Sequence, residues 1–226
     1  MFLLETHMHT SESSACGHLT AAQQVLQYKK AGYDAVIITD HFINGNSAVD
    51  RSLPWKQQME DQFKGYRNAK IKGDEVGLKV FEGIEYAYHG TEFVVLGLGE
   101  KWFKDHEEIK EFEPKDFLKV FRDAGAAVIQ AHPYREASYI KEIRLFPDLV
   151  DAVEVFNYHN DILWNNRAKA YAYEHNLPMT AGSDCHDSYE YASGIACDKD
   201  INTLDELVAL IKSGKGWTYF ENIRTI

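Results

Sequence analysis

The sequence has few cysteines, few prolines and no long apolar run: 3 of its 226 residues are Cys and 5 are Pro. Cys16, Cys185 and Cys197 show no paired spacing, so we expect neither a disulfide framework nor a closed structural zinc site. The first apolar run stops after Leu4, which is too short for a membrane span or a secretory signal. These features predict a cytoplasmic protein that does not contact a membrane.

Basic residues are also scarce. There are 24 Lys and Arg against 35 Asp and Glu, which gives a formal net charge of −11. Such a charge opposes non-specific attraction to nucleic acid, and the aromatic residues do not alternate with basic ones as they do along a single-strand groove. Nucleic acid is therefore not an expected partner, and a phosphate-bearing ligand would need a local source of positive charge.

Apolar runs alternate with amphipathic segments along most of the chain. The expected strands cover residues 2–6, 35–39, 79–84, 93–98, 127–130, 152–155 and 179–182, with a possible extra edge strand at 217–220. The expected helices cover residues 19–31, 56–70, 114–124, 139–145, 161–174 and 203–213. This alternation is typical of parallel βα units, and no repeat or linker interrupts it. The pattern predicts one α/β domain over residues 1–226, whose sheet can close into a barrel.

Histidine is the residue present in unusual number, with ten copies. His7 and His9 follow the first expected strand, and residues two apart on a strand face the same side. Both imidazoles can therefore converge on one metal ion. An isolated pair of this kind is a weak signal, because two exposed histidines near a terminus produce the same pattern.

Further metal-binding residue types close four of the later strands. They are His41, Glu85, His132 and the pair Asp184 and His186. The carboxyl ends of parallel strands are where ligands and catalytic groups gather in barrel proteins, whereas core histidines would be scattered over strand middles and helix faces. Mixed imidazole and carboxylate donors suit Zn, Mn or Fe. The sequence therefore predicts one metal-binding rim, with Cys185 pointing away from it.

The motifs together resemble the successive motifs of a known family, the PHP (polymerase and histidinol phosphatase) family of metal-dependent phosphoesterases. The resemblance extends from His7 to His186 and rests on order and spacing more than on any single motif. The motifs are His7-Met-His9-Thr, Thr39-Asp-His41, Gly83-Ile-Glu85, Ala131-His132-Pro and Ser183-Asp184-Cys-His186. The resemblance implies a distorted (β/α)7 TIM-like barrel that binds two or three divalent metal ions (Zn, Mn or Fe).

The same resemblance implies which residues hold each ion. His7, His9, Glu85 and Asp184 would hold the first ion, and Glu85 would bridge to a second ion that His132 also holds. A third ion would be held by His41 and His186, and His18 is the nearest candidate to complete its ligand set. The fourth expected strand lacks the His that many family members have for the second ion, and His89 is only a fallback.

A metal-activated water would make a side-chain nucleophile unnecessary. The predicted function is hydrolysis of a phosphate ester on a small phosphorylated substrate, by a phosphomonoesterase of the histidinol-phosphatase kind or by a phosphodiesterase. Glu85, Asp184 and Arg135 are the predicted catalytic residues, and Arg135, Asn157 and His159 are predicted to bind substrate. His159 could also protonate a leaving group.

The role of Arg135 has two readings from the sequence. Arg135 lies three residues past His132 and could grip a phosphate with two parallel hydrogen bonds. It could equally be a surface residue paired with Glu136 or Glu142.

Two other functions remain open at this stage. An amidohydrolase-type C–N hydrolase also opens with an H-x-H motif, although it usually bridges its ions with a modified Lys where Glu85 stands here. The missing fourth-strand His leaves room for a regulatory module that binds metal without turnover. His106 and His175 lie in charged helical surroundings and are expected on the surface. The natural substrate and the oligomeric state are not predicted.

Overall fold

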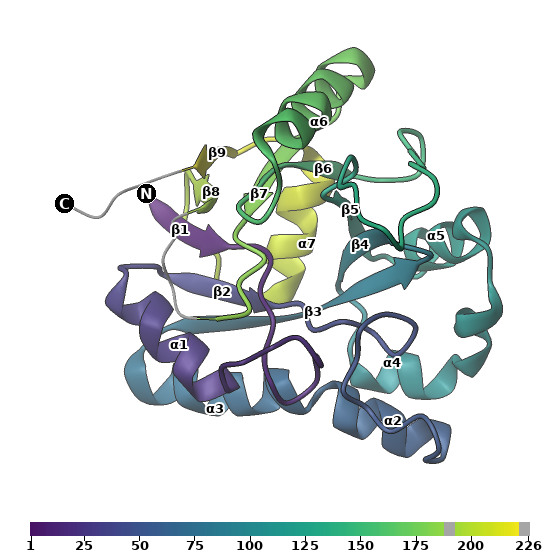
Figure 1. The fold of residues 1–226 in the computed structure, drawn as a ribbon. Coiled ribbons are helices and arrows are strands. Elements are labelled where there is room, and N and C mark those ends of the chain that lie inside the picture. The colour runs from purple at the N-terminus through teal and green to yellow at the C-terminus, as the bar shows by residue number, and fades with distance from the viewer. Residues whose placement is uncertain (188–192, 222–226) are drawn as a thin grey trace.

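A computed structural model describes residues 1–187 and 193–221. Its strands form one sheet in the order β7-β6-β5-β4-β3-β2-β1-β8-β9 (Figure 1). The strands are β1 (Phe2–Glu5), β2 (Ala35–Ile38), β3 (Lys79–Tyr88), β4 (Thr91–Leu96), β5 (Ala127–Ala131), β6 (Ala152–Asn157), β7 (Met179–Gly182), β8 (Ser193–Cys197) and β9 (Trp217–Glu221). The helices are α1 (Ala21–Lys30), α2 (Trp55–Gln62), α3 (Lys64–Val76), α4 (Glu100–Asp105), the 3₁₀ helix η1 (Glu107–Glu111), α5 (Pro114–Asp123), α6 (Ile162–His175) and α7 (Leu204–Ser213).

The sheet curves until the chain after β7 meets the chain after β1. The backbone N–H of Asp184 donates to the carbonyl of His7 at 2.8 Å, and the N–H of His9 donates to the carbonyl of Cys185 at 2.9 Å. Met8 and Cys185 form a parallel bridge between these two segments. Strands β1 to β7 therefore make a nearly closed barrel, which confirms the predicted distorted (β/α)7-type fold. That residues 1–226 form a single domain stays a prediction.

Strand β4 breaks the expected parallel pattern, because it runs antiparallel to both β3 and β5. Strand β3 continues past Glu85 to Tyr88, and the chain reverses at His89 and Gly90, whose φ angles are 48° and 81°. Two consecutive residues with positive φ make a tight hairpin turn that matches the twist of the strands. The start of β4 therefore lies at the metal-binding rim, where the sequence analysis had placed the ends of strands.

Several expected helices and strands differ from those observed. The segment 139–145 is not helical, because Tyr139 and Ile143 stay exposed and no continuous apolar face is buried. Instead the Gln130 side chain holds the segment, and its Nε2 donates to the carbonyl of Arg144 at 2.7 Å. The expected helix 56–70 is two helices that meet at Phe63. Helices α4 and η1 and strand β8 were not expected, whereas β9 confirms the extra edge strand.

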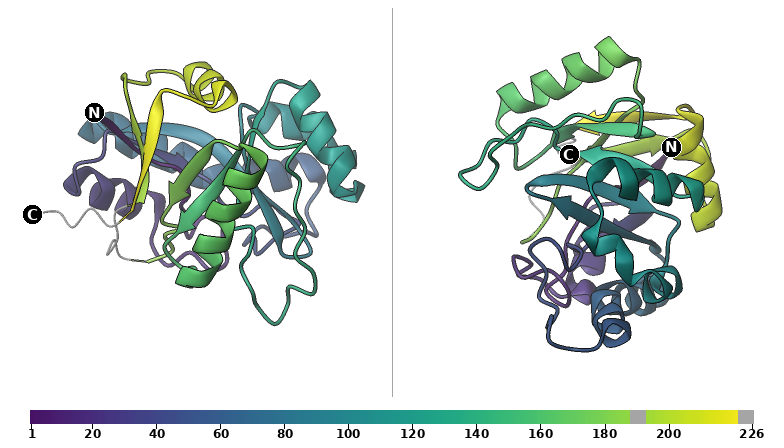
Figure 2. Two further views of the ribbon diagram at one scale, coloured as in Figure 1. Left: turned by 90° about the horizontal axis from the view of Figure 1, so that it is seen from above. Right: turned by 90° about the vertical axis from the view of Figure 1, so that its right-hand side faces the viewer.

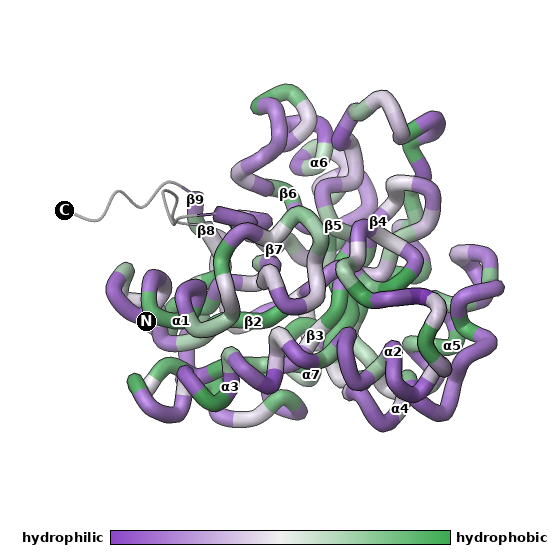
Figure 3. Tube along the Cα trace, turned by 60° about the horizontal axis from the view of Figure 1, so that its bottom comes forward, coloured by the Kyte–Doolittle hydropathy of each residue, from purple (hydrophilic) through white to green (hydrophobic). Residues whose placement is uncertain are grey.

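Hydrophobic packing fills the barrel at the end opposite the strand-end motifs. Leu207 and Ile211 of α7 belong to one buried cluster with Leu4, Ile37 and Ile129 of the barrel strands. Helix α6 packs outside β6, and the pair α1 and α3 lies on the opposite side of the barrel, with α3 against β3 (Figures 1 and 2). Strand β2 is hydrophobic along its length, whereas the outer helices are mixed (Figure 3). No described helix has the length and hydrophobicity that a bilayer crossing requires.

A fully buried carboxyl group supports the closure between β1 and β7. Glu5 Oε1 accepts hydrogen bonds from the backbone N–H groups of His7 (2.9 Å) and Ser183 (3.0 Å), and Oε2 accepts one from the Tyr28 hydroxyl (3.1 Å). Burial outweighs these hydrogen bonds and raises the pKa of Glu5 from 4.5 to about 7. The folded protein therefore binds a proton at Glu5 more tightly than the unfolded chain does.

We expect Glu5 to make the metal-free protein less stable as pH rises. The stability that comes from protonated Glu5 is present below pH 4.5 and is lost as pH rises through about 7. Relative to wild type, Glu5→Gln should gain up to about 3 kcal/mol in free energy of unfolding between pH 5 and pH 8. Urea unfolding with a chelator present measures this difference. Glu136→Gln, at an exposed position, should show no such trend, and a pH-independent difference for Glu5→Gln would contradict the assignment.

Candidate metal centre

The structure brings the strand-end motifs together at one rim of the barrel. His7 and His9 follow β1, His41 follows β2, Glu85 lies within β3, His132 follows β5, and Asp184 and His186 follow β7. All of these residues are buried except His186, which is partly exposed. Seven of the eight predicted metal ligands therefore occupy one connected cluster.

Glu85 stands at the centre of this cluster. Its Oε1 lies 3.1 Å from His7 Nε2 and 3.0 Å from His132 Nε2. Its Oε2 lies 2.7 Å from His41 Nδ1 and 3.5 Å from His9 Nε2. One carboxylate thus faces four imidazoles from three other strand ends, which is the arrangement a bridging ligand requires.

Asp184 faces two of the same imidazoles, those of His7 and His9. Its Oδ1 lies 3.0 Å from His9 Nε2 and 3.6 Å from His7 Nε2. The backbone at Asp184 has φ of 55°, in the left-handed region that non-glycine residues rarely adopt. Strain of this kind persists only where the surrounding structure enforces it, which is common at functional sites.

Several polar atoms in the cluster are buried without a hydrogen bond. Among the described residues, His7 Nε2, His41 Nδ1 and Glu85 Oε2 have no hydrogen-bond partner, although each lies close to an oppositely charged or polar atom. Their distances suit electrostatic attraction, but their geometry does not meet that of a hydrogen bond. Buried polar atoms normally find partners, so this pattern fits donors arranged around cations.

Four groups of three side chains have ligand atoms within 4.8 Å of one another in the described residues. They mix imidazoles with carboxylates in three cases and contain only imidazoles in the fourth. The groups are His7, His9 and Asp184; His7, Glu85 and His132; His41, Glu85 and Glu92; and His9, His41 and His186. Such donor sets suit Zn, Mn or Fe, so the residues present fit the predicted metal ions.

The charges in the cluster support the same interpretation. Burial alone would lower the pKa of His7, but Glu154, Glu85 and Asp184 outweigh burial and hold that pKa well above its ordinary value. Burial would raise the pKa of Glu85, but the charges of His7 and His41 hold it well below its ordinary value. The protonated forms of His7 and His41 and the ionised carboxylates thus favour each other in the metal-free protein. Metal ions compete with protons for these imidazoles, so metal affinity should fall as pH falls.

A second layer of hydrogen bonds fixes the imidazoles of His7 and His132. Glu154 Oε1 lies 2.9 Å from His7 Nδ1, and Oε2 accepts the backbone N–H of His132 at 3.0 Å. A carboxylate on Nδ1 directs the Nε2 lone pair of His7 toward the cluster. Gly182 makes room for this contact, since a Cβ there would lie 2.5 Å from both Glu154 Oε1 and His7 Cβ. The sequence analysis missed Glu154, which lies inside an apolar strand segment.

A similar layer supports His9 and His41. The Ser14 hydroxyl donates to Asp40 Oδ1 at 2.7 Å, lies 3.1 Å from His9 Nδ1, and accepts the backbone N–H of His41 at 3.0 Å. Asp40 also accepts two hydrogen bonds from Thr10. His9 therefore has its Nε2 left to face the cluster.

Glu92 is a metal-binding candidate that was not predicted from the sequence. Its Oε2 lies 3.4 Å from His132 Nε2 and its Oε1 lies 3.7 Å from His41 Nδ1. This carboxylate stands where the fourth expected strand had no His to offer. The feature that could have located Glu92 is the two-residue turn at His89 and Gly90. Such a turn predicts a hairpin, which brings the first residues of β4 to the rim.

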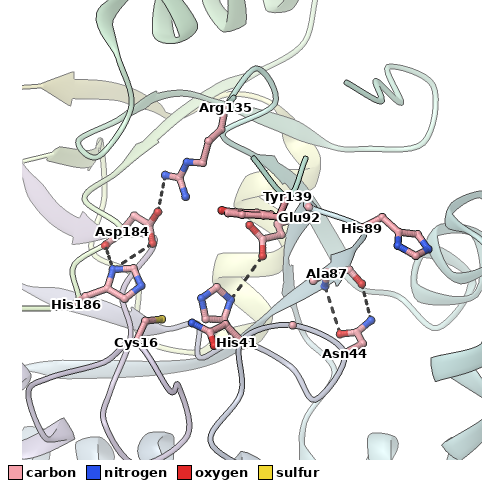
Figure 4. Close-up of a pocket in the computed structure, with 13 residues that line it drawn as sticks. Cys16, His41, Asn44, Ala87, His89, Glu92, Arg135, Tyr139, Asp184 and His186 are labelled. Carbon is pink, nitrogen blue, oxygen red and sulfur yellow. Dashed lines mark hydrogen bonds and ion pairs between the residues drawn. The ribbon is translucent and has the colours of Figure 1, made fainter. Parts of the chain in front are cut away.

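An open pocket with a cavity volume of about 700 Å³ lies over the cluster (Figure 4). Arg135 reaches over it, with Nη2 donating to Asp184 Oδ2 at 2.7 Å and to Asn157 Oδ1 at 2.9 Å. Glu136 pairs instead with Arg167, so Arg135 is not the surface ion pair that the sequence left open. Asp184 outweighs burial and raises the pKa of Arg135, which stays charged.

The remaining predicted residues lie around this pocket. Asn157 is fully buried and donates from Nδ2 to Glu154 Oε2 at 3.0 Å and to Asp184 Oδ2 at 3.3 Å. His159 is exposed, with its ring 5.8 Å from that of His186. His89 is exposed and lines the outer pocket, where it points away from the other lining residues (Figure 4).

His18 is the predicted ligand that the structure does not bring to the cluster. It is exposed, its backbone N–H donates to the carbonyl of His186 at 2.8 Å, and it belongs to none of the ligand groups found in the described residues. Cys185 is buried with its sulfur 3.1 Å from the carbonyl of Asp187, on the side away from the cluster, as predicted.

Comparisons with known proteins agree with this arrangement. Residues 163–216 match the PHP-associated family model. An uncharacterized protein of Methanocaldococcus jannaschii is 29% identical over 141 residues, which are 62% of this chain and 68% of the relative.

Solved structures show the same fold. A two-domain protein from Bacteroides vulgatus that contains a predicted PHP-like metal-dependent phosphoesterase aligns with a TM-score of 0.68 and 15% identity. The alignment covers 97% of this chain and 64% of that protein, so this chain spans less than two thirds of its length. A candidate metal-dependent phosphoesterase from Bifidobacterium adolescentis aligns with a TM-score of 0.55 and 17% identity, over 82% of this chain and 88% of that one.

The five motifs meet at one rim of the barrel, and the C-terminal part of the chain matches the PHP-associated model. These findings support the resemblance to the PHP family that was drawn from the sequence: a PHP-associated model matches residues 163–216, and the fold is that of PHP-like structures.

Proposed function

We propose that this protein is a metal-dependent phosphoesterase that hydrolyses small phosphorylated substrates, with phosphomonoesters as the first expectation. One observation carries the proposal. A buried cluster of imidazoles around the Glu85 carboxylate lies beside the charged guanidinium of Arg135 at the floor of an open pocket. Cation-binding donors next to a fixed cationic side chain suit an anionic, oxygen-rich substrate, despite the net charge of −11.

His7, His9, Glu85 and Asp184 would hold a first divalent ion. Glu85, Glu92 and His132 would hold a second, with the Glu85 carboxylate between the two. Ions bound there supply an activated water at neutral pH and offset charge on the phosphate oxygens. Glu154 and Ser14 keep the imidazoles in the tautomers that face the ions, because each contacts the Nδ1 atom of its histidine.

Arg135 would bind the phosphate group. Two of its nitrogens are held by Asp184, Asn157 and Asn160, and within the described residues Nη1 has no hydrogen-bond partner. A guanidinium fixed in this way needs little reorganisation to donate to an incoming anion. Asn157 orients Arg135 and Asp184 together, and His159 at the outer edge would contact the leaving group.

The sequence left two alternatives open. A C–N hydrolase of the amidohydrolase type is disfavoured, because no Lys lines the pocket in the described residues and Glu85 occupies the central position. A module without turnover was suggested by the missing fourth-strand His. Glu92 weakens that alternative, because a carboxylate is available at the same place.

Metal removal and reloading test the proposal. We expect chelated protein to be inactive on a generic aryl phosphate, and activity to return with Mn, Zn or Fe added singly. Chelator-treated protein reloaded with the original ion is the control for irreversible damage. An aryl diester and an amide panel, assayed in parallel, separate the other hydrolase classes. Protein that holds two or more ions by elemental analysis yet turns over no phosphate ester would overturn the proposal.

A further inference from the structure

The imidazole group formed by His9, His41 and His186 contains no carboxylate. The His9 ring centroid lies 4.3 Å from that of His41 and 4.4 Å from that of His186, so the His9 ring is stacked against both of the others. The Nδ1 atom of His9 contacts the Ser14 hydroxyl, and its Nε2 atom faces Asp184 in the group that also contains His7. One nitrogen lone pair can bind only one ion. If His9 binds the first ion together with His7 and Asp184, only His41 and His186 of this group remain to bind the third ion.

Cys16 is the further donor at that position. It lines the pocket together with His41 and His186. Figure 4 shows its sulfur beside these two side chains. The other two cysteines are buried elsewhere, Cys185 with its sulfur toward Asp187 and Cys197 in the strand paired with β1.

The loop that carries Cys16 is anchored on both sides. The N–H of Ala15 donates to the carbonyl of Asn46 at 2.9 Å, and the N–H of His18 donates to the carbonyl of His186 at 2.8 Å. Gly17 is needed at this turn, since a Cβ there would lie 2.6 Å from the backbone of Thr10. Residue 16 is thus held between the segments that present His41 and His186, whereas His18 is exposed and is not among the described residues that line the pocket.

We propose that Cys16, rather than His18, completes a third metal position with His41 and His186, and that its thiolate makes this position selective for zinc or cobalt over manganese. The inference rests on the proposed function only in needing metal ions at this centre. Sulfur and imidazole donors are typical of zinc, whereas manganese prefers oxygen. The thiol proton passes to solvent when the sulfur binds the ion.

Cobalt spectroscopy tests the inference without an activity assay. Metal-free protein titrated with Co²⁺ should develop a near-ultraviolet sulfur-to-cobalt charge-transfer band. Cys16→Ser should lose this band and one ion per chain by elemental analysis. His18→Ala and Cys197→Ser should keep both. A band that survives in Cys16→Ser, or that disappears in His18→Ala but not in Cys16→Ser, would overturn the assignment.

Thiol protection in the wild-type chain gives a second measurement that does not depend on a variant folding. Zinc-loaded protein should protect Cys16 from iodoacetamide, and chelated or manganese-loaded protein should not, as read by peptide mass spectrometry. Equal labelling of Cys16 in all three forms would contradict the proposal. Protein that hydrolyses phosphate esters without a cobalt–sulfur band overturns only this inference, whereas a band without hydrolysis overturns only the proposed function.

Discussion

Replacing Glu85 by Gln is expected to lower kcat/KM on a phosphate ester by about 10³-fold. A metal ion contributes several kcal/mol of transition-state stabilisation, and each 1.36 kcal/mol is tenfold in rate. Gln keeps the size of the side chain but removes the negative charge that faces His7 and His41. We therefore also expect at least one ion fewer per chain. Steady-state kinetics and elemental analysis of the same preparations measure the two effects.

The matched control for this variant is Glu136→Gln. Glu136 is exposed and pairs with Arg167 outside the pocket, so its loss should leave kinetics and metal content unchanged. Circular dichroism and thermal melting establish that both variants fold. A folded Glu85→Gln protein with wild-type kcat/KM and a full complement of ions would show that Glu85 is not the bridging ligand.

Replacing Arg135 by Ala is expected to lower kcat/KM by about 10²-fold, the usual effect of removing one positioned donor to developing charge. We expect kcat to decrease and KM to increase, because the guanidinium would contact the phosphate in both the ground state and the transition state. The Ki of inorganic phosphate should rise as well. Arg135→Lys should recover only part of the activity, since an ammonium cannot form the paired hydrogen bonds of a guanidinium.

Arg167→Ala provides the comparison, because this arginine is exposed and its partner Glu136 lies outside the pocket. Arg135 also contacts Asp184, so metal content must be measured in each variant. A drop in activity that additional metal restores would assign Arg135 to positioning Asp184. An Arg135→Ala protein with unchanged phosphate affinity would contradict direct binding.

Much of the metal centre could be predicted from the sequence because it is built from strand ends. His7, His9, His41, His132 and Asp184 each follow a short apolar run. Periodicity locates such runs well, and the geometry of parallel strands brings their carboxyl ends to one edge. The predicted convergence therefore needed only the fold class and not the detailed packing.

The residues that were missed depend on chain reversal and on buried contacts. Glu92 reached the rim because β4 runs antiparallel after the turn at His89 and Gly90. Glu154 lies within β6, and its contact with His7 joins residues 147 positions apart. Neither contact leaves a periodic signal in the chain.

The sequence by itself determined that five motifs of metal-binding residues stand after buried strands, and hence the resemblance to the PHP family and the location of the centre. Only the tertiary structure decided which carboxylate lies beside His132 and His41, which partner holds Arg135, and that Cys16 rather than His18 lines the pocket. The physical reason is that strand order follows from local hydrophobic patterns, whereas ligand choice depends on the direction of individual side chains. A tight turn, a loop anchored by a few backbone hydrogen bonds and a buried carboxylate set those directions.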